Sequence, residues 1–493
     1  MKIVIINPPD QYKCIENPDD KGRGFLESDD FGAFPPLGAL YVLSYLEAHS
    51  TGHQLHFIDC VGEKMSHQRL RARLGEIRPD LVGITSFTIS LLDVRLAARA
   101  VREIVPGAHI CLGGHHPIAY PLEAAGLAEF DSVVVGEGEY AFSELVKALD
   151  AGADFTRIQG VYTGQSVGKH IGAGGTDRRF LARVAVPPAY VDDLDAIPMV
   201  NRNYIRHIKY HNILGVSGDL ATVLSSRGCP YLCTFCDVPY KAYRQRSAEL
   251  VLDEIQACMD MGYGEFRFYD DLFNITPGKV IEFCQAIEDR GMKFPWDFRG
   301  RANTVSRESL LKAKQSGLRM IAFGVETGTD EGLKLLKKGA KTDKFKEVFA
   351  WCRELGILTV ADYLIGLPFE KTPAEVRKSI DFLIELDPDF AQISILKLYP
   401  NTALHDQALD QGIVRPGRWQ AFSAAPEKDF LVDHWNEHLD LASLIRLQKS
   451  AYRRFYFRPR YILRSALGTR SLYELSSKIH GALKLLRSNQ RSA

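Results

Sequence analysis

Three cysteines, Cys229, Cys233 and Cys236, lie within eight residues at a C-x3-C-x2-C spacing. They follow directly on Ala221–Leu224, a run typical of a short buried strand. Thiolates are soft ligands that select iron–sulfur clusters or zinc. No fourth Cys or His stands close by, which favours a cluster with one open iron, because structural zinc sites close all four positions. The alternative is a loop of incidental buried cysteines, against which three in one Gly- and Pro-containing loop argue.

This motif, with the aromatic Phe235 just before the third cysteine, resembles the signature of the radical S-adenosylmethionine (SAM) superfamily. The resemblance implies that the three cysteines bind a [4Fe-4S] cluster whose open iron is chelated by SAM, and that Phe235 belongs to the cofactor-binding residues. It also implies reductive cleavage of SAM to methionine and a 5′-deoxyadenosyl radical. An electron donor such as flavodoxin or ferredoxin is then expected as a partner.

Length and composition limit the other possibilities. A chain of 493 residues is suited to two or three domains. Its formal net charge is zero, so composition gives no reason to expect nucleic-acid binding. No stretch approaches the roughly 18 uninterrupted apolar residues of a membrane span. The nine cysteines, an odd number, favour a reducing, cytoplasmic location over a disulfide framework.

The first 150 residues alternate apolar β-rich runs with helical patterns. The expected strands are Lys2–Ile6, Gln54–Ile58, Leu81–Thr85, His109–Leu112 and Ser132–Val135. The expected helices are Leu37–Ala48, Gln68–Ile77, Asp93–Val105 and Ala141–Ala151. This alternation predicts a doubly wound, flavodoxin-like (Rossmann-like) α/β domain, whose ligands bind outside the carboxyl ends of the strands.

The strand-end strings of this region resemble the cobalamin-binding domain that precedes many radical SAM domains. They are Pro35-Pro36-Leu37-Gly38, the loop Gly113-Gly114-x-His116-Pro117, and Val135-Gly136-Glu137-Gly138-Glu139. The resemblance implies a cobalamin cofactor held by Gly114, His116, Gly136 and Glu137. Glycines at such loops allow a flat, bulky ligand to approach the backbone. A domain that holds no cofactor is the alternative.

One position departs from the cobalamin pattern. Many cobalamin proteins carry D-x-H-x-x-G, whose His ligates cobalt. Here Asp59 is followed by Val61 at the His position and by Lys64 at the Gly position. The departure argues against a cobalt-ligating His from this loop and leaves His115 and His116 as the nearest imidazoles.

Residues 151–215 are rich in Gly, Pro and Asp and are predicted to form a linker. Residues 216–405 repeat strands and helices, which predicts a partial (β/α)6 barrel of the TIM type, with its functional groups at the carboxyl ends of the strands. Its expected helices are Leu250–Gly262, Ser306–Ser316, Asp330–Lys337 and Pro373–Glu385. Its later expected strands are Glu265–Tyr269, Trp296–Arg299, Met320–Val325, Leu358–Ile365 and Ala391–Leu398.

The strand ends of the barrel carry further polar strings. Asp270 and Asp271 follow the second strand, and a carboxylate there can hold the SAM amino group or cap the next helix. Gly324-Val325-Glu326-Thr327-Gly328 and Gly366-Leu367-Pro368 match family elements, so the resemblance assigns Glu326 to SAM binding. Gly339 is expected as a helix C-cap, and Tyr269 and Tyr363 are expected in the core.

Residues 406–493 are predicted to form a helical, aromatic and basic region. From Ala451 to Ala493 there are ten Lys or Arg residues against one acid, Glu474. A cap packed on the barrel is favoured, and peripheral contact with an anionic membrane is the alternative. The substrate is expected to be a small or lipid-like molecule.

The family resemblance implies a cobalamin-dependent radical SAM methyltransferase that methylates an unactivated carbon in a biosynthetic pathway. The same cofactors also serve radical cyclisation, dehydration, rearrangement and aminocarboxypropyl transfer, which spacing cannot separate. A non-catalytic metal-binding module is the remaining alternative. The ordered strand-end motifs argue against it, because a structural metal site needs none of them.

Overall fold

The structure is a computed structural model that describes residues 1–15, 32–165, 189–212, 214–215 and 219–467. The chain divides into two compact units. The first contains Met1–Ile15, Phe34–Lys209 and Pro416–Leu431, and the second contains Glu16–Ala33, Tyr210–Arg415 and Val432–Ala493. The expected domain limits at residues 150, 215 and 405 stay predictions.

The first unit is built on a six-stranded sheet of order β3-β1-β4-β5-β6-β7. Its strands are β1 (Lys2–Asn7), β3 (Gln54–Asp59), β4 (Leu81–Ser86), β5 (His109–Gly114), β6 (Ser132–Val134) and β7 (Val161–Tyr162). All neighbours pair in parallel except β7, which is antiparallel to β6. The strand order reverses between β1 and β4, so a ligand crevice is expected at the carboxyl ends of these two strands.

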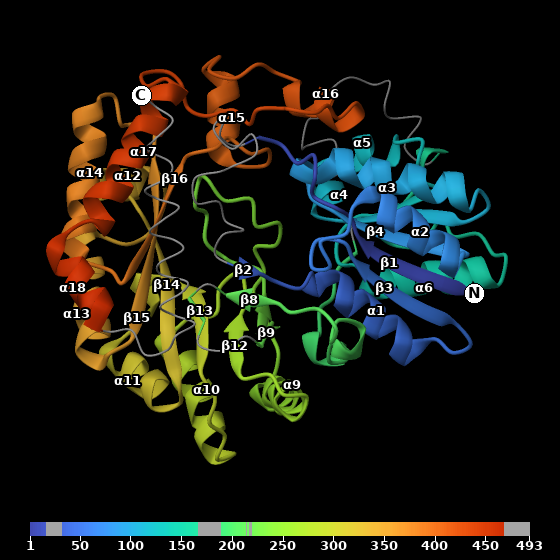
Figure 1. Ribbon diagram of the computed structural model, residues 1–493, viewed down its shortest axis with the longest axis horizontal. Coiled ribbons are helices and arrows are strands. Elements are labelled where there is room, and N and C mark those ends of the chain that lie inside the picture. Colours follow the sequence, from blue (N-terminus) through green and yellow to red (C-terminus); the bar gives the residue numbers. More distant parts are fainter. Residues whose placement is uncertain (16–31, 166–188, 213, 216–218, 468–493) are drawn as a thin grey trace. The chain divides into compact units, whose positions relative to one another are not determined.

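Helices cover both faces of this sheet (Figure 1). The described helices of this unit are α1 (Leu37–His49), α2 (His67–Ile77), α3 (Leu91–Ile104), α4 (His115–Ala119), α5 (Pro121–Ala125), α6 (Gly138–Asp150) and α16 (Arg418–Ala424), with short 3-10 turns η3 (Thr88–Ser90), η4 (Leu194–Ala196) and η5 (Arg202–Tyr204). Helix α1 packs with α6, and α2 packs with α3. This arrangement confirms the doubly wound α/β domain expected from the sequence.

The second unit is built on a parallel sheet of order β16-β15-β14-β13-β12-β9. Its strands are β9 (Leu220–Val223), β12 (Glu265–Phe268), β13 (Trp296–Gly300), β14 (Leu318–Glu326), β15 (Leu358–Ile365) and β16 (Phe390–Ile395). Two short antiparallel ladders accompany it, β2 (Gly32–Ala33) with β8 (His211–Asn212), and β10 (Ser226–Arg227) with β11 (Arg244–Gln245). The six parallel strands confirm the predicted partial barrel.

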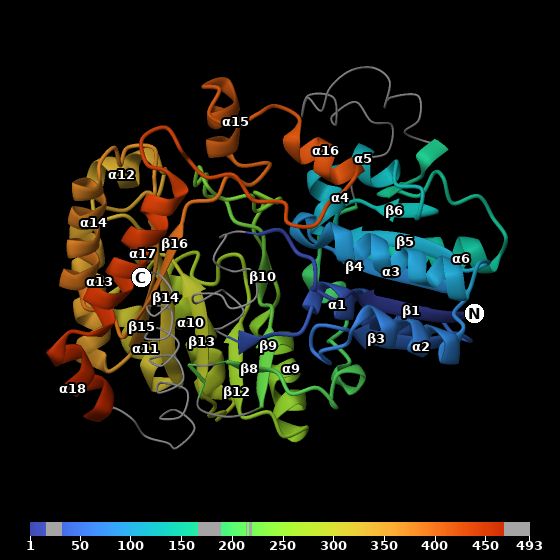
Figure 2. The same cartoon turned by 45° about the horizontal axis from the view of Figure 1, so that its top comes forward.

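Most helices of the second unit pack outside these strands (Figure 2). They are α9 (Ala248–Asp260), α10 (Pro277–Asp289), α11 (Arg307–Gln315), α12 (Asp330–Leu335), α13 (Thr342–Leu355), α14 (Pro373–Leu386), α15 (Ala403–Asp410), α17 (Leu441–Tyr456) and α18 (Pro459–Leu467), with the 3-10 turn η6 (Ala302–Thr304). Alternate strand residues face these helices and form the core, including Phe266, Trp296 and Phe323. Helices α10 and α13 are not among the elements expected from the sequence pattern.

Helix α17 covers the free edge of the barrel at β16. The Gln448 side chain donates to the Ile393 carbonyl at 2.8 Å, and the Tyr452 hydroxyl accepts from the Ile393 amide at 2.9 Å. The Tyr456 hydroxyl bonds both backbone groups of Ala391 at 3.0 Å. Side chains thus replace the missing neighbouring strand, so the described part of the aromatic C-terminal region forms the expected cap. The basic residues beyond 467 lie outside the described residues.

The end of helix α12 corrects one expectation. The helix stops at Leu335, and the residue with the left-handed backbone is Lys337, with a φ of 51°. The amide of Lys338 donates to the Leu333 carbonyl at 2.9 Å, which closes the helix. Gly339 therefore does not cap the helix. No helix among the described residues is long and apolar enough to cross a lipid bilayer.

Candidate active site

The three motif cysteines lie on one loop, which begins at Gly228 after β10 and returns at β11. The ladder between β10 and β11 closes the base of this loop, and the Cys229 amide donates to the Tyr240 carbonyl at 3.0 Å. Gly228 has a φ of 84°, and a Cβ there would meet the Ala242 carbonyl oxygen at 2.2 Å. Only glycine fits this close approach of two backbones.

The thiols of Cys229, Cys233 and Cys236 are partly exposed and unoxidised. Burial raises the pKa of Cys229 and of Cys236, and the charge of Cys233 raises both further. Within the described residues, no three His, Cys, Asp or Glu side chains surround a position for a single metal ion. A four-iron cluster takes each thiolate on a different iron, so its ligand sulfurs stand farther apart than those around one ion.

Asp270 and Asp271 anchor this loop from the carboxyl end of β12. One Asp270 oxygen accepts from the Ser225 amide at 2.8 Å and from the Ser226 hydroxyl at 2.8 Å. Burial raises the pKa of Asp270 to about 6, and its second oxygen is buried without a partner. Asp271 is exposed and accepts from the Gly228 amide at 2.9 Å. Both carboxylates are therefore placed at the cluster loop, and neither caps α10, which is capped by Thr276.

Glu326 ends β14 in a buried ion pair. Its carboxylate lies 2.7 Å from the Lys338 ammonium group, and each side chain is 8% exposed. Burial raises the pKa of Glu326, and Lys338 opposes that shift. The Lys338 nitrogen also lies 5.7 Å from the centre of the Phe235 ring. That ring is partly buried and packs against a hydrophobic cluster that includes Leu367 and Leu398. The structure thus brings together Phe235 and Glu326, both predicted from the sequence, through Lys338, which sequence reasoning did not assign.

The inner face of the barrel is polar and open. Arg299 on β13 pairs with Asp362 on β15 at 3.2 Å, and 60% of the arginine side chain is exposed. Tyr269 is 52% exposed, so its expected place in the core is wrong, because it follows β12 on the inner face. Tyr363 is 1% exposed and lies in the core as expected.

The Glu370 carboxylate holds the Gly366-Leu367-Pro368 turn, and the sequence analysis did not single out this residue. Glu370 is buried and accepts from the Leu367 amide at 3.0 Å. Burial raises its pKa to about 7. Its second oxygen is buried without a partner.

In the first unit, Gly114 and His116 lie at the carboxyl end of β5. Gly114 has a φ of 91°, and a Cβ there would meet the Ser86 amide at 2.5 Å. The His116 ring is fully buried; one nitrogen lies 3.1 Å from the Thr88 hydroxyl, and the other has no partner. Burial lowers the pKa of His116 to about 3, so the ring is neutral. Beside it, Phe87 is 60% exposed and stacks on His115 at 5.8 Å.

Gly136 and Glu137 contact the backbone of Ala189 and Val191. A Cβ on Gly136 would meet the Ala189 carbonyl oxygen at 2.2 Å. The Glu137 amide donates to that carbonyl at 3.0 Å, and its carboxylate accepts from the Val191 amide at 2.6 Å. These contacts give Gly136 and Glu137 a structural role that needs no ligand.

The loop after β3 carries Val61 at the position where the D-x-H-x-x-G motif has its histidine. Asp59 is buried and accepts from the Asn7 side chain at 2.7 Å and from the Gly62 amide at 3.0 Å. Val61 is 39% exposed. This loop therefore presents an apolar side chain where many cobalamin proteins place their cobalt-ligating imidazole.

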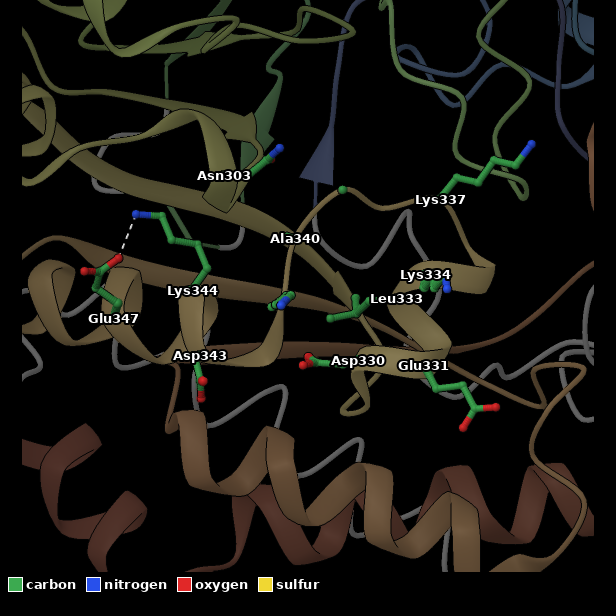
Figure 3. Close-up of a pocket in the computed structure, with 12 residues that line it drawn as sticks. Asn303, Asp330, Glu331, Leu333, Lys334, Lys337, Ala340, Asp343, Lys344 and Glu347 are labelled. Atoms are coloured by element: carbon green, nitrogen blue, oxygen red, sulfur yellow. Dashed lines mark hydrogen bonds and ion pairs between the residues drawn. The ribbon is translucent and has the colours of Figure 1, made fainter.

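A groove of about 1290 Å³ runs beside α12 and the start of α13 (Figure 3). Its lining includes Lys334, Lys337, Lys341 and Lys344 together with Asp330, Glu331, Asp343 and Glu347. Lysines and acids are equal in number, so the lining favours no ligand charge. None of the residues predicted to bind a cofactor lines this groove.

Known proteins share both units. The model of the radical SAM superfamily matches residues 223–383, and that of the B12 binding domain matches residues 31–146. An uncharacterized methyltransferase of Pyrococcus horikoshii is 27% identical over 94% of this chain and 94% of its own length. The anaerobic magnesium-protoporphyrin IX monomethyl ester cyclase of Cereibacter sphaeroides is 30% identical over 77% of this chain and 61% of its own length.

Solved structures show the same fold. The radical SAM methyltransferase TsrM of Kitasatospora setae, with tryptophan and a SAM analogue bound, superposes with a TM-score of 0.72 at 19% identity and covers 100% of both chains. The fold and the cysteine loop define a two-unit protein of the radical SAM type. The chain belongs to the radical SAM superfamily, in the group whose members carry a B12-binding domain ahead of the radical SAM domain.

Proposed function

We propose that this enzyme is a cobalamin-dependent radical SAM methyltransferase that acts on an unactivated carbon of a small molecule. The observation that carries the proposal is the three-cysteine loop at the carboxyl end of a six-stranded parallel barrel, closed by β10–β11 and anchored by Asp270 and Asp271. A relative named as a methyltransferase that aligns over 94% of both chains supports methyl transfer.

The loop fits a [4Fe-4S] cluster and SAM. Three soft thiolates bind three of the four irons and leave one iron for a cofactor. The unpartnered Asp270 oxygen and the buried Glu326 carboxylate are polar groups near this loop that suit the SAM amino and ribose groups. When bound, the cluster and SAM supply a carbon-centred radical by one-electron reduction. Cys229, Cys233 and Cys236 hold the cluster, and Asp271 orients their loop through Gly228.

The first unit fits cobalamin at the carboxyl ends of β4 and β5. An exposed Phe87–His115 stack and a glycine backbone at Gly114 suit a flat macrocycle. The unpartnered nitrogen of His116 is a further polar group there. Cobalamin supplies the methyl group that a carbon radical accepts. Val61 and the absence of a D-x-H-x-x-G motif support binding without a histidine from the β3 loop.

The inner face of the barrel indicates the substrate class. The Arg299–Asp362 pair and the exposed Tyr269 place charged and hydrogen-bonding groups where a substrate reaches the radical. Covering such groups with a wholly apolar lipid would remove the water around them, at a cost of several kcal/mol. We therefore infer a substrate with polar or charged groups beside its methylated carbon.

Radical cyclisation is the second candidate, because a relative at 30% identity is named as a cyclase. The two reactions differ in the products of SAM. Methyl transfer yields S-adenosylhomocysteine besides 5′-deoxyadenosine, whereas cyclisation needs no S-adenosylhomocysteine. Methylthioadenosine would indicate aminocarboxypropyl transfer.

The test is anaerobic reconstitution with iron, sulfide and cobalamin, followed by SAM, reductant and mass spectrometry of the products. Cys233→Ala should abolish 5′-deoxyadenosine formation. Cys284→Ala is the matched control, because burial raises the pKa of that core thiol to about 11 and keeps it inert. A Cys233→Ala protein that still cleaves SAM would contradict the cluster assignment.

Partners and location complete the proposal. Reductive cleavage needs a one-electron donor of the flavodoxin or ferredoxin type, and an odd number of cysteines, nine, suits the reducing cytoplasm. Ile462 and Leu463 on α18 are 51% and 62% exposed beside basic residues, which supports peripheral membrane contact as a lesser proposal.

A further inference from the structure

Arg301 connects the carboxyl end of β13 to the cluster loop. Its side chain is buried, with 6% of the residue exposed. One guanidinium nitrogen, Nη1, lies 3.2 Å from the Cys233 sulfur and donates to it. The guanidinium carbon lies 3.7 Å from the centre of the Tyr231 ring, on the same loop. Nε donates to the Asn303 side chain at 3.2 Å.

The backbone of Arg301 is fixed as firmly as its side chain. Asn274 is fully buried, and its side-chain oxygen accepts from the Arg301 amide at 3.0 Å while its nitrogen donates to the Arg301 carbonyl at 2.8 Å. The Thr304 hydroxyl donates to the same carbonyl at 3.1 Å. The guanidinium is therefore held toward Cys233 before any cofactor binds.

Among the residues that the structure describes, no carboxylate forms an ion pair with Arg301. Arginine stays protonated in proteins, and none of the ion pairs between described residues includes Arg301. The charge of Arg301 acts to lower the pKa of Glu326, but the Glu326 carboxylate pairs with Lys338. The Asp362 carboxylate pairs with Arg299. A buried cation without an anion is costly. This cation donates to the neutral side chain of Asn303 and to the sulfur of Cys233, and only the sulfur can become an anion.

We infer that Arg301 is a positioning residue that holds Cys233 and raises the reduction potential of the cluster bound there. The inference rests on the proposed function, which places a [4Fe-4S] cluster on this thiolate. One-electron reduction adds one negative charge to the cluster. A buried cation that donates to a ligand sulfur stabilises the more negative state, so reduction becomes easier. The electron comes from an external donor, and no proton moves.

The first test compares Arg301→Gln, which removes the charge, with Arg301→Lys, which keeps it. The midpoint potential is followed by electron paramagnetic resonance during a reductive titration. For Arg301→Gln we expect at least a tenfold lower ratio of reduced to oxidised cluster at a fixed potential, about 59 mV for one electron. Arg301→Lys should retain more than half of the wild-type advantage.

Lys337→Gln is the matched control. It removes the same charge from a residue whose carbonyl lies 3.9 Å from the Cys233 sulfur but whose side chain is exposed to water. Screening by water should leave the ratio of reduced to oxidised cluster at a fixed potential within about twofold of the wild type, which is about 18 mV for one electron. Equal potentials in wild type, Arg301→Gln and Arg301→Lys, or an equal fall in Arg301→Gln and Lys337→Gln, would overturn the inference.

A second measurement needs no variant to assemble a cluster. Wild-type protein carrying guanidino-¹⁵N arginine is reduced and studied by pulsed electron paramagnetic resonance. A ¹⁵N coupling to the reduced cluster of the wild type is the expected result, and a wild type without such coupling overturns the inference. A wild type that binds no iron contradicts the proposed function instead, so the two failures are distinguishable.

Discussion

The Lys338 ammonium group lies 2.7 Å from the Glu326 carboxylate, and both side chains are 8% exposed. The pair joins the end of β14 to the turn after α12, and Glu326 holds a φ of 68°, which is unusual for a residue other than glycine. Lys338 opposes the rise in pKa that burial gives Glu326, and it holds the side chain of the residue that we assign to SAM binding.

Removing one partner of this pair should cost stability and SAM affinity. Lys338→Met leaves a buried carboxylate without its counter-charge, which we expect to lower the free energy of unfolding by about 3–5 kcal/mol. Chemical denaturation and SAM titration measure the two effects. Lys346→Met is the control, because its 2.7 Å pair with Glu385 is exposed, so its loss should change the free energy of unfolding far less. Equal losses in the two variants would contradict the role of burial.

Gly228→Ala should prevent cluster assembly. The added Cβ would meet the Ala242 carbonyl oxygen at 2.2 Å, so the base of the cysteine loop must open. We expect the iron content after reconstitution to fall at least about tenfold. Gly262→Ala carries a similar positive φ of 96° with no atom within 4 Å, so it should lose only about 1–2 kcal/mol and bind iron normally. Normal iron content in Gly228→Ala would refute this reading of the loop.

Glu370 should make the stability of the barrel fall as the pH rises. Its pKa is raised from 4.5 to about 7 by burial, so the folded state binds a proton that the unfolded state has released. The stabilising contribution is complete below pH 4.5 and is lost between pH 4.5 and 7, with a total on the order of 3 kcal/mol.

Glu370→Gln mimics the protonated carboxyl group and should flatten this part of the profile, which thermal unfolding at several pH values measures. Glu375→Gln provides the contrast. Its pKa is lowered by hydrogen bonds from Thr372, so its contribution is present above pH 4.5 and lost as the pH falls. A profile that Glu370→Gln leaves unchanged would exclude Glu370 as the source.

Tyr452→Phe should loosen the edge of the barrel. It deprives the Ile393 amide of its 2.9 Å acceptor, and an unsatisfied buried amide costs about 1–3 kcal/mol. Hydrogen exchange at Ile393 should accelerate at least about fivefold, while amides of β1 in the other unit stay unchanged as the internal control. Unchanged exchange at Ile393 would show that water or another group satisfies the amide.

Local sequence patterns were sufficient to predict most of the strands and helices. Strand β15 begins and ends at the predicted residues, Leu358 and Ile365. A largely apolar, β-rich run predicts a strand, and Gly366, with a φ of 74°, ends it. The end of α12 was misjudged, since Lys337 takes the left-handed position that usually selects glycine. Tyr269 was misjudged for a different reason, because a barrel strand has two faces and the inner one is open.

The sequence by itself determined the class of protein. Cysteine spacing and strand-end glycines depend on neighbours along the chain, and they sufficed to identify the cluster loop and the two α/β units. Only the tertiary structure decided which side chains meet across strands. Arg301 reaches Cys233 from 68 positions away in the chain, and Asn274 fixes it from 27 positions away. Such contacts depend on strand order and burial, which no local pattern encodes.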